Sequence, residues 1–223
     1  MTQISSSRRL IVFVRAPELG RLKTRLAADA GDRRALSIYR ALAEHTLDVA
    51  RRVADCRLVV HYAPAGAASV MTRWLGSDIE LRAQQEGDLG ERLAGAIDDA
   101  LIHGARSVVV VGTDCPGVTV ELVERAFTEL ERHDVVLGPA IDGGYYMIGV
   151  RKAHSTLFLG IPWSTGETLS ATLSAARAAD LDVSLLDERR DIDTLADWRA
   201  WCAEAPEWVG YASARSSGPL PSE

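Results

Sequence analysis

The first residues whose spacing suits chemistry lie directly after the first apolar run of the chain, in the segment 15–26 (RAPELGRLKTRL). Proline and glycine shape a loop there, and its cations gather beside a predicted helix start, whose free N–H groups also attract anions. Such a loop could bind a diphosphate; a solvated basic turn is the competing interpretation. The spacings of a P-loop and of a dinucleotide-binding glycine motif are both absent. The candidate phosphate-binding residues of this loop are Arg15, Pro17, Gly20, Lys23 and Arg25.

A second candidate is Asp114, which follows the apolar run 107–111 (SVVVV) and precedes residues that force a turn. A strand that apolar belongs in the middle of a parallel sheet, so Asp114 is expected at the carboxyl edge of the sheet. A carboxylate there suits a divalent cation that bridges phosphate oxygens. Alternatively, Asp114 caps a turn or the next helix, for which Thr119 is an equally good candidate. Cys115 is interpreted as a small buried thiol, because no base for a nucleophile is apparent.

Asp191 and Asp193 form a third candidate, because residues two apart in an extended segment present their carboxylates on one face. That arrangement suits a metal ion or a pair of hydroxyl groups. The alternative is that both carboxylates pair with the neighbouring Arg189 and Arg190.

Asp142 precedes two adjacent glycines, Gly143 and Gly144, and then a tyrosine, Tyr145. Adjacent glycines allow a positive φ and a close approach of the backbone to a ligand. Asp142 could then accept hydrogen bonds from sugar hydroxyls or act as a catalytic carboxylate. A hairpin turn with a core tyrosine would give the same pattern.

Arg92 is expected one turn inside a helix, from which it could reach a nucleotide. That helix is predicted to begin at the capping box Asp88-x-x-Glu91, which makes Asp88 structural. Two more capping boxes are predicted at Thr194-x-x-Asp197 and Ser164-x-x-Glu167.

Strand and helix patterns alternate along the chain, which predicts a three-layer α/β fold with a mostly parallel sheet and a ligand site at the carboxyl ends of its strands. The expected strands are 10–14, 57–62, 107–112, 134–137, 145–150 and 183–186. The expected helices are about 33–53, 66–75, 89–103, 119–132, 166–179 and 194–204. Residues 1–205 are expected to form one domain, and residues 206–223, rich in proline and serine, a flexible tail.

The 223 residues carry a formal net charge of −6, which argues against binding nucleic acid through a broad basic surface. Residues 1–60 contain 12 Arg or Lys against 6 Asp or Glu, and only Lys23 and Lys152 are lysines. Three widely spaced cysteines favour neither disulfides nor a zinc site. With no signal peptide or membrane span visible, a cytoplasmic protein is expected. The sequence leaves open whether the chain forms a homo-oligomer.

Six short motifs occur in order along residues 9–202: RAPxxGxxKTRL, QxxGDLGER, GTDCPG, PxxDGGYYxIG, IPWST and DIDT. In this order they resemble a bacterial family of GT-A-type glycosyltransferases, some associated with arsenosugar pathways and radical-SAM neighbours. The family is similar in fold to 2-phospholactate guanylyltransferase and molybdenum-cofactor guanylyltransferase. A departure from those nucleotidyltransferases is the first loop, where 16–20 (APELG) replaces a longer glycine-rich segment.

The resemblance implies a GT-A fold in which Lys23 and Arg25 contact phosphates and Asp114, with Asp193 or Asp191, holds Mg²⁺ or Mn²⁺. The leading hypothesis is glycosyl transfer from a nucleotide sugar to a small acceptor, with Lys23 and Asp142 as the candidate catalytic residues. The segment 142–146 (DGGYY) favours transfer of a sugar over transfer of a nucleotide. Nucleotidyl transfer from an NTP, with release of pyrophosphate, is the alternative. A nucleotide-binding protein without catalytic activity is a third hypothesis.

Overall fold

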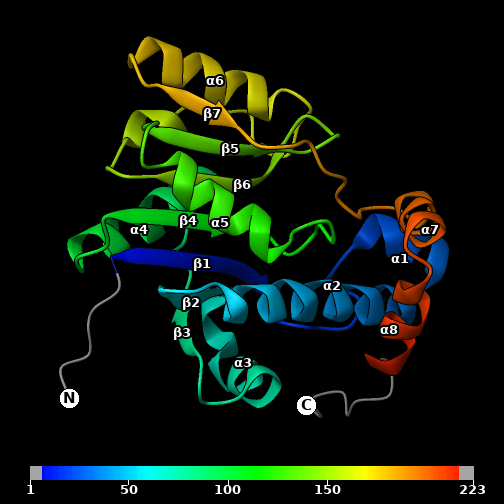
Figure 1. Cartoon of the computed structure of the whole chain (residues 1–223). Helices are drawn as coiled ribbons and strands as arrows, with labels where there is room; N and C mark the ends of the chain where they lie inside the picture. Colours follow the sequence, from blue (N-terminus) through cyan, green and yellow to red (C-terminus); the bar gives the residue numbers. More distant parts are fainter. Residues whose placement is uncertain (1–6, 216–223) are drawn as a thin grey trace.

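The centre of the computed structural model, which describes residues 7–215, is a seven-stranded sheet (Figure 1). The strand order is β3-β2-β1-β4-β6-β5-β7; β6 runs antiparallel to β4 and β5, and the other neighbours are parallel. The strands are β1 (Arg8–Arg15), β2 (Cys56–Ala63), β3 (Glu80–Ala83), β4 (Ser107–Val111), β5 (Val135–Pro139), β6 (Tyr145–Val150) and β7 (Val183–Leu185).

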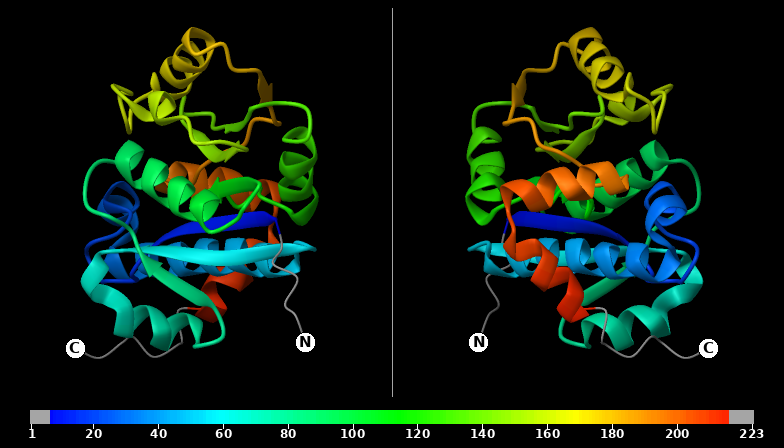
Figure 2. Two further views of the ribbon diagram at one scale, coloured as in Figure 1. Left: turned by 90° about the vertical axis from the view of Figure 1, so that its left-hand side faces the viewer. Right: turned by 90° about the vertical axis from the view of Figure 1, so that its right-hand side faces the viewer.

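Helices cover both faces of this sheet, which confirms the expected three-layer α/β fold. One face packs against α2, α3 and α5, and the other against α4 and α6 (Figures 1 and 2). The helices are α1 (Thr24–Ala30), α2 (Asp32–Arg52), α3 (Ala68–Leu75), α4 (Leu89–Ile102), α5 (Val120–Glu129), α6 (Thr168–Ala178), α7 (Leu195–Glu204) and α8 (Glu207–Arg215). Two short 3₁₀ turns, Ala65–Ala67 and Ser155–Phe158, complete the elements. Within residues 7–215, no helix has both the length and the apolar character that a membrane span requires.

The central strands β1 and β4 are buried on both faces, because they lie between the two helical layers. In β4, Val108, Val109, Val110 and Val111 are each at most 3% exposed. Such a run of β-branched residues is typical of an interior parallel strand. β1 and β4 run in register from Arg8↔Ser107 to Val12↔Val111, so both strands end at the same edge of the sheet.

Helices α1, α7 and α8 gather with α2 beside that edge, on the right of Figure 1. The tail expected from residue 206 is wrong for Glu207–Arg215, which forms α8. Trp208 is only 6% exposed, and the Ser37 hydroxyl of α2 donates a hydrogen bond of 2.8 Å to the carbonyl of Ala212. The rest of the expected tail, residues 216–223, lies outside the described part of the chain.

Three of the four expected helix caps are present. Asp88 and Glu91 form a capping box at the start of α4, Thr194 and Asp197 form one at α7, and Thr119 caps α5. The capping box expected at Ser164 is wrong, since α6 begins only at Thr168.

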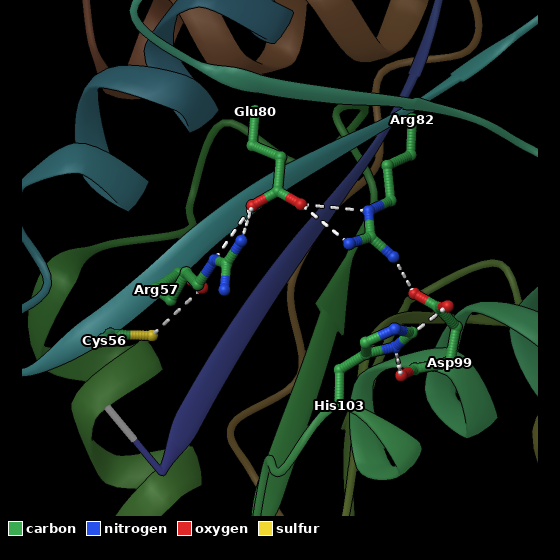
Figure 3. A network of polar contacts seen from close by, with 6 residues as sticks. All are labelled: Cys56, Arg57, Glu80, Arg82, Asp99 and His103. Atoms are coloured by element: carbon green, nitrogen blue, oxygen red, sulfur yellow. Dashed lines mark hydrogen bonds and ion pairs between the residues drawn. The ribbon is translucent and has the colours of Figure 1, made fainter. Parts of the chain in front are cut away.

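A chain of ion pairs ties α4 to β2 and β3 (Figure 3). Arg57 Nη2 lies 2.7 Å from Glu80 Oε2, and Arg82 Nη2 lies 2.9 Å from Glu80 Oε1. Arg82 also pairs with Asp99 of α4, whose Oδ1 is 3.2 Å from Nδ1 of His103. These contacts hold α4, whose first turns carry Arg92, against the outer half of the sheet.

Candidate functional site

Two adjoining cavities, of about 600 and 370 Å³, open at the carboxyl end of β1 and β4. The larger lies along the sheet face that α4 covers, and its floor includes Phe13, Val110 and Ile148. The smaller lies beside the basic loop and is lined by Lys23, Arg25 and Asp193, among others. The residues that line both cavities are Arg15, Tyr39, Asp114 and Ser164.

Lys23 lines the smaller cavity and pairs with Asp114, which lines both cavities. Its Nζ lies 2.9 Å from Oδ1 of Asp114 and 2.8 Å from Oδ1 of Asp193, and its side chain is only 6% exposed. Burial alone would lower the pKa of Lys23, but Asp114 and Asp193 outweigh it and raise that pKa. The backbone of Lys23 is left-handed (φ 49°, ψ 50°), which is uncommon for a side chain of this type. Lys23 is therefore a buried, charged ammonium held between two carboxylates.

Asp191 points a buried carboxylate into the larger cavity. Its Oδ1 is buried and has no hydrogen-bond partner within the described residues. Burial, followed by the charge of the nearby Asp114, raises the pKa of Asp191 to about 7; Asp142 and Asp193 add to this, and Lys23 opposes it. Negative charge is thus in excess around Asp191, and a cation or a proton would compensate it.

The alternative pairing of these aspartates with their arginine neighbours does not occur. Asp193 pairs with Lys23, and Arg189 pairs instead with Asp187, at 3.3 Å. The segment is held extended beside β5, where the N–H of Arg189 donates a hydrogen bond of 3.0 Å to the carbonyl of Pro139.

Arg15 is anchored by Tyr39 of α2 rather than by an ion pair. The Tyr39 hydroxyl donates to the carbonyl of Arg15 (2.7 Å) and accepts from its N–H (2.8 Å). The double contact fixes the end of β1, where the basic loop begins. Tyr39 and Ser164 are lining residues that sequence reasoning missed. In the sequence, Tyr39 fits the apolar face of a helix, and nothing near Ser164 indicates a cavity. In the structure, Ser164 has a positive φ of 61°.

Arg92 lines the larger cavity, and its Nε donates to the carbonyl of Gly87 (2.9 Å). Arg25 lines the smaller one. Pro17 and Gly20 shape the loop between β1 and α1 but line neither cavity; Gly20 has a φ of +74°.

The Asp142 turn lies between β5 and β6, with the backbone of Gly143 packed against the backbone of Gly166. A Cβ on Gly143 would lie 2.2 Å from the carbonyl oxygen of Gly166, and the φ of Gly143 is +88°. The N–H of Gly144 donates to Oδ1 of Asp142 (2.9 Å). Asp142, Gly143 and Gly144 line neither cavity, although Asp142 is close enough to influence the pKa of Asp191. The positive φ and the contact with Gly166 thus account for a glycine at position 143.

Cys115, next to Asp114, is fully buried, and burial raises the pKa of its thiol. It is a packing residue, as its sequence context indicated.

The carboxylates of Asp114 and Asp191 would fit a divalent cation whose other ligands are the phosphates of a bound substrate. Within residues 7–215, no group of three or more His, Cys, Asp or Glu side chains is arranged to hold a metal by itself. Mg²⁺, however, is commonly held by one or two carboxylates together with substrate phosphates. Asp114 supplies such a carboxylate at both cavities, and the unpartnered oxygen of Asp191 offers a second in the larger one.

The fold is that of the nucleotide-diphospho-sugar transferases, as a solved structure shows. A "putative nucleotide-diphospho-sugar transferase" from Desulfovibrio desulfuricans G20 is 32% identical to the chain, with a TM-score of 0.86 over 94% of this chain and 98% of that one. Within that class, the chain belongs to the bacterial family described as "Uncharacterized protein conserved in bacteria (DUF2064)", whose model matches residues 46–165. No curated protein matches the chain.

More distant structures share the fold alone. CMP:2-keto-3-deoxy-manno-octonic acid synthetase, solved with CTP, is 13% identical, with a TM-score of 0.59 over 90% of this chain and 99% of that one. Rv0371C from Mycobacterium tuberculosis H37Rv, solved with manganese, is 20% identical, with a TM-score of 0.51 over 86% and 97%.

Proposed function

We propose that the protein is a metal-dependent transferase that binds a nucleotide sugar and passes its glycosyl group to a small acceptor. The observation that carries this proposal is the ion-pair cluster of Lys23, Asp114 and Asp193 in the smaller cavity at the carboxyl edge of the sheet, with Asp114 also lining the larger cavity. Cations and carboxylates together at such an edge suit a diphosphate and its counter-ion. The relative named as a nucleotide-diphospho-sugar transferase, 32% identical, supports the choice of donor.

The diphosphate would lie in the smaller cavity, where Lys23 and Arg25 offer positive charge. A bound Mg²⁺ or Mn²⁺, held by Asp114 with Asp191 or Asp193, would neutralise charge on the departing diphosphate. Arg15 would also bind the diphosphate, from the end of β1, where Tyr39 fixes the backbone of Arg15. Preorganised cations of this kind stabilise the charge that develops on a leaving group.

The rest of the donor and the acceptor would occupy the larger cavity, whose apolar floor and polar rim suit a ring with hydroxyl groups. Arg92 lies on its rim and would contact the nucleotide. Asp142 does not line this cavity but lies near enough to affect the pKa of Asp191, which does. It would accept a hydrogen bond from a sugar hydroxyl, or take the proton of the acceptor, where the ligand extends beyond the cavity towards the turn of Gly143 and Gly144. The link to arsenosugar pathways, which the resemblance implies for some family members, stays a prediction.

The test is a thermal-shift titration of the full chain with Mn²⁺ and a panel of UDP-, GDP-, ADP- and CDP-sugars and NTPs. A nucleotide sugar should raise the melting temperature more than the matching NTP, and only with the metal, because ligands that bind the native state stabilise it. Asp114→Asn should abolish the metal-dependent part of the shift. Asp78→Asn, at an exposed position before β3, is the control and should keep it.

Contrary outcomes separate the alternatives. Preference for an NTP, with release of pyrophosphate when a phosphorylated acceptor is added, would favour nucleotidyl transfer over glycosyl transfer. Tight binding with no hydrolysis of any donor would favour a nucleotide-binding protein without catalytic activity. An Asp114→Asn variant with an unchanged metal-dependent shift would overturn the assignment of the metal site.

A further inference from the structure

We infer that Lys23 acts as a place-holder for the divalent cation: its ammonium occupies the carboxylates of Asp114 and Asp193 until the metal displaces it, and then turns to the diphosphate. This inference rests on the proposed function, because it presupposes a metal at these carboxylates. Lys23 would pair first with the two carboxylates and then, once the metal is bound, with the diphosphate.

The contacts of Lys23 are those of an ion in a site rather than of a free phosphate ligand. Its Nζ lies within 3 Å of one oxygen from each of two aspartates, one after β4 and one before α7. The Lys23 side chain is 6% exposed, whereas those of Asp114 and Asp193 are 45% and 41% exposed. The carboxylates are therefore open to an incoming ion, and the ammonium beneath them is covered.

The same two Oδ1 atoms cannot hold the ammonium and a divalent cation together at close range, since two positive ions that share ligands repel each other strongly in a partly buried site. The cavity beside Lys23 offers the ammonium somewhere to go, because the proposed diphosphate would lie there with Arg25. The alternative is that the metal binds the second oxygen of each aspartate while Lys23 stays in place. The two arrangements differ in whether Lys23 becomes accessible when the metal binds.

The backbone conformation of Lys23 also supports this inference. A left-handed conformation is unfavourable for a lysine, and no side-chain capping bond holds Lys23 at the start of α1. The ion pairs with Asp114 and Asp193 are the side-chain contacts found for Lys23 within the described residues. Loss of these contacts on metal binding would leave the strained residue free to move.

The first experiment measures the affinity for Mn²⁺ alone, without nucleotide, by calorimetry on wild type and Lys23→Met. If Lys23 competes with the metal, the variant should bind Mn²⁺ roughly tenfold more tightly, since hydrogen bonds between charged groups have that order of strength. Arg25→Met is the matched control, because it removes a positive charge from the same cavity without freeing a carboxylate. It should change the Mn²⁺ affinity much less.

The second experiment uses wild type only, so it does not depend on a variant that folds. The chain has two lysines, and Lys152 is exposed, which makes it an internal standard. Acetylation with an N-hydroxysuccinimide ester, followed by peptide mass spectrometry, reports the accessibility of each lysine. Lys23 should react slowly in the free protein, several-fold faster with Mn²⁺, and slowly again with Mn²⁺ and pyrophosphate. The rate at Lys152 should stay constant.

Two results would overturn the inference while leaving the metal site intact. One is that Lys23→Met binds Mn²⁺ as wild type does, or more weakly. The other is that Mn²⁺ binds to wild type and leaves the labelling of Lys23 unchanged, as expected if the metal used only the outer oxygens. Absence of Mn²⁺ binding to both proteins, with and without pyrophosphate, would instead reject the proposed metal site and the exchange with it.

Discussion

The backbone N–H of Ile192 donates a hydrogen bond of 2.9 Å to the backbone carbonyl of Asp114. This bond joins the loop after β4 to the segment before α7, which are far apart in the chain. It brings the carboxylates on either side of Ile192 to Asp114: Asp191 lines the larger cavity and Asp193 the smaller. The Ile192 side chain is fully buried with Leu26 and Trp198, so packing behind the site holds this alignment.

Shortening that side chain should therefore damage the site as well as the fold. We expect Ile192→Ala to lower the free energy of unfolding by about 2–5 kcal/mol, the usual range for such a core truncation. It should also weaken Mn²⁺ binding, because Asp191 and Asp193 lose their support. Urea unfolding and calorimetry measure the two effects.

The control for this variant is Ile97→Ala, in α4, which is 1% exposed and belongs to the core on the other face of the sheet. It should cost similar stability and leave Mn²⁺ affinity unchanged. Equal losses of Mn²⁺ affinity in both variants would show that the site responds to general destabilisation rather than to Ile192.

Removing the Tyr39 hydroxyl should loosen the start of the basic loop. Tyr39→Phe leaves the N–H and the carbonyl of Arg15 without their partner, which should cost about 1–3 kcal/mol in the free energy of unfolding. Pyrophosphate affinity should fall too, because Arg15 lines both cavities. Denaturant titration and calorimetry provide the measurements. Tyr62→Phe, at a buried tyrosine of β2, should leave pyrophosphate affinity unchanged; an equal fall there would contradict the role given to Tyr39.

His61 should make stability depend on pH. Burial, and then the charge of Arg82, lower the pKa of His61 to about 4, with a smaller effect of Arg9 in the same direction; Asp99 and Glu80 oppose it. Between pH 6.5 and 4 the unfolded chain therefore binds a proton at this position and the folded chain does not. Stability must fall as the pH falls through this window, by at most about 3 kcal/mol from this residue.

Urea unfolding at several pH values between 4 and 8 tests this, with His61→Gln for comparison. The variant should show a shallower loss of stability on acidification, whatever its stability at neutral pH. A slope that is the same in His61→Gln and wild type would contradict the lowered pKa.

The elements that could be predicted from the sequence are those with long apolar patterns. The runs at 10–14 and 107–112 correspond to β1 and β4, because interior strands are apolar on both faces. The four-residue β3 was missed because each of its residues is at least partly exposed, which leaves no apolar run. Helix α8 was missed because the prediction rested on the proline and serine content of the tail. The burial of Trp208 depends on contacts with α2 and α7, which the local sequence does not show.

The position of Asp114 could be predicted from the sequence, but its contacts could not. Asp114 lies at the carboxyl edge of the sheet because it follows an apolar strand, which is a local feature of the sequence. The bonds from Lys23 to Asp114 and Asp193 join distant parts of the chain, and no spacing rule reveals such pairs. The motif at Ser164 predicts a helix cap, whereas in the structure Ser164 has a positive φ and lines both cavities.

The turn that carries Asp142 should be intolerant of a single methyl group. Gly143→Ala must keep a φ of +88° and place its Cβ 2.2 Å from the carbonyl oxygen of Gly166. Backbone cannot yield as a flexible side chain can, so we expect a loss of about 2–4 kcal/mol in the free energy of unfolding or a displaced turn.

Gly160→Ala separates the two causes, because Gly160 also has a positive φ (+68°) but open space around its Cβ position. It should cost only about 1 kcal/mol, the price of the conformation alone. Urea unfolding compares the two variants. Equal losses would show that the turn moves freely away from Gly166, and the fixed position assumed for Asp142 in the reaction would then be untenable. A larger loss at Gly143, together with weaker binding of the donor sugar, would tie the packing of this turn to the placement of Asp142.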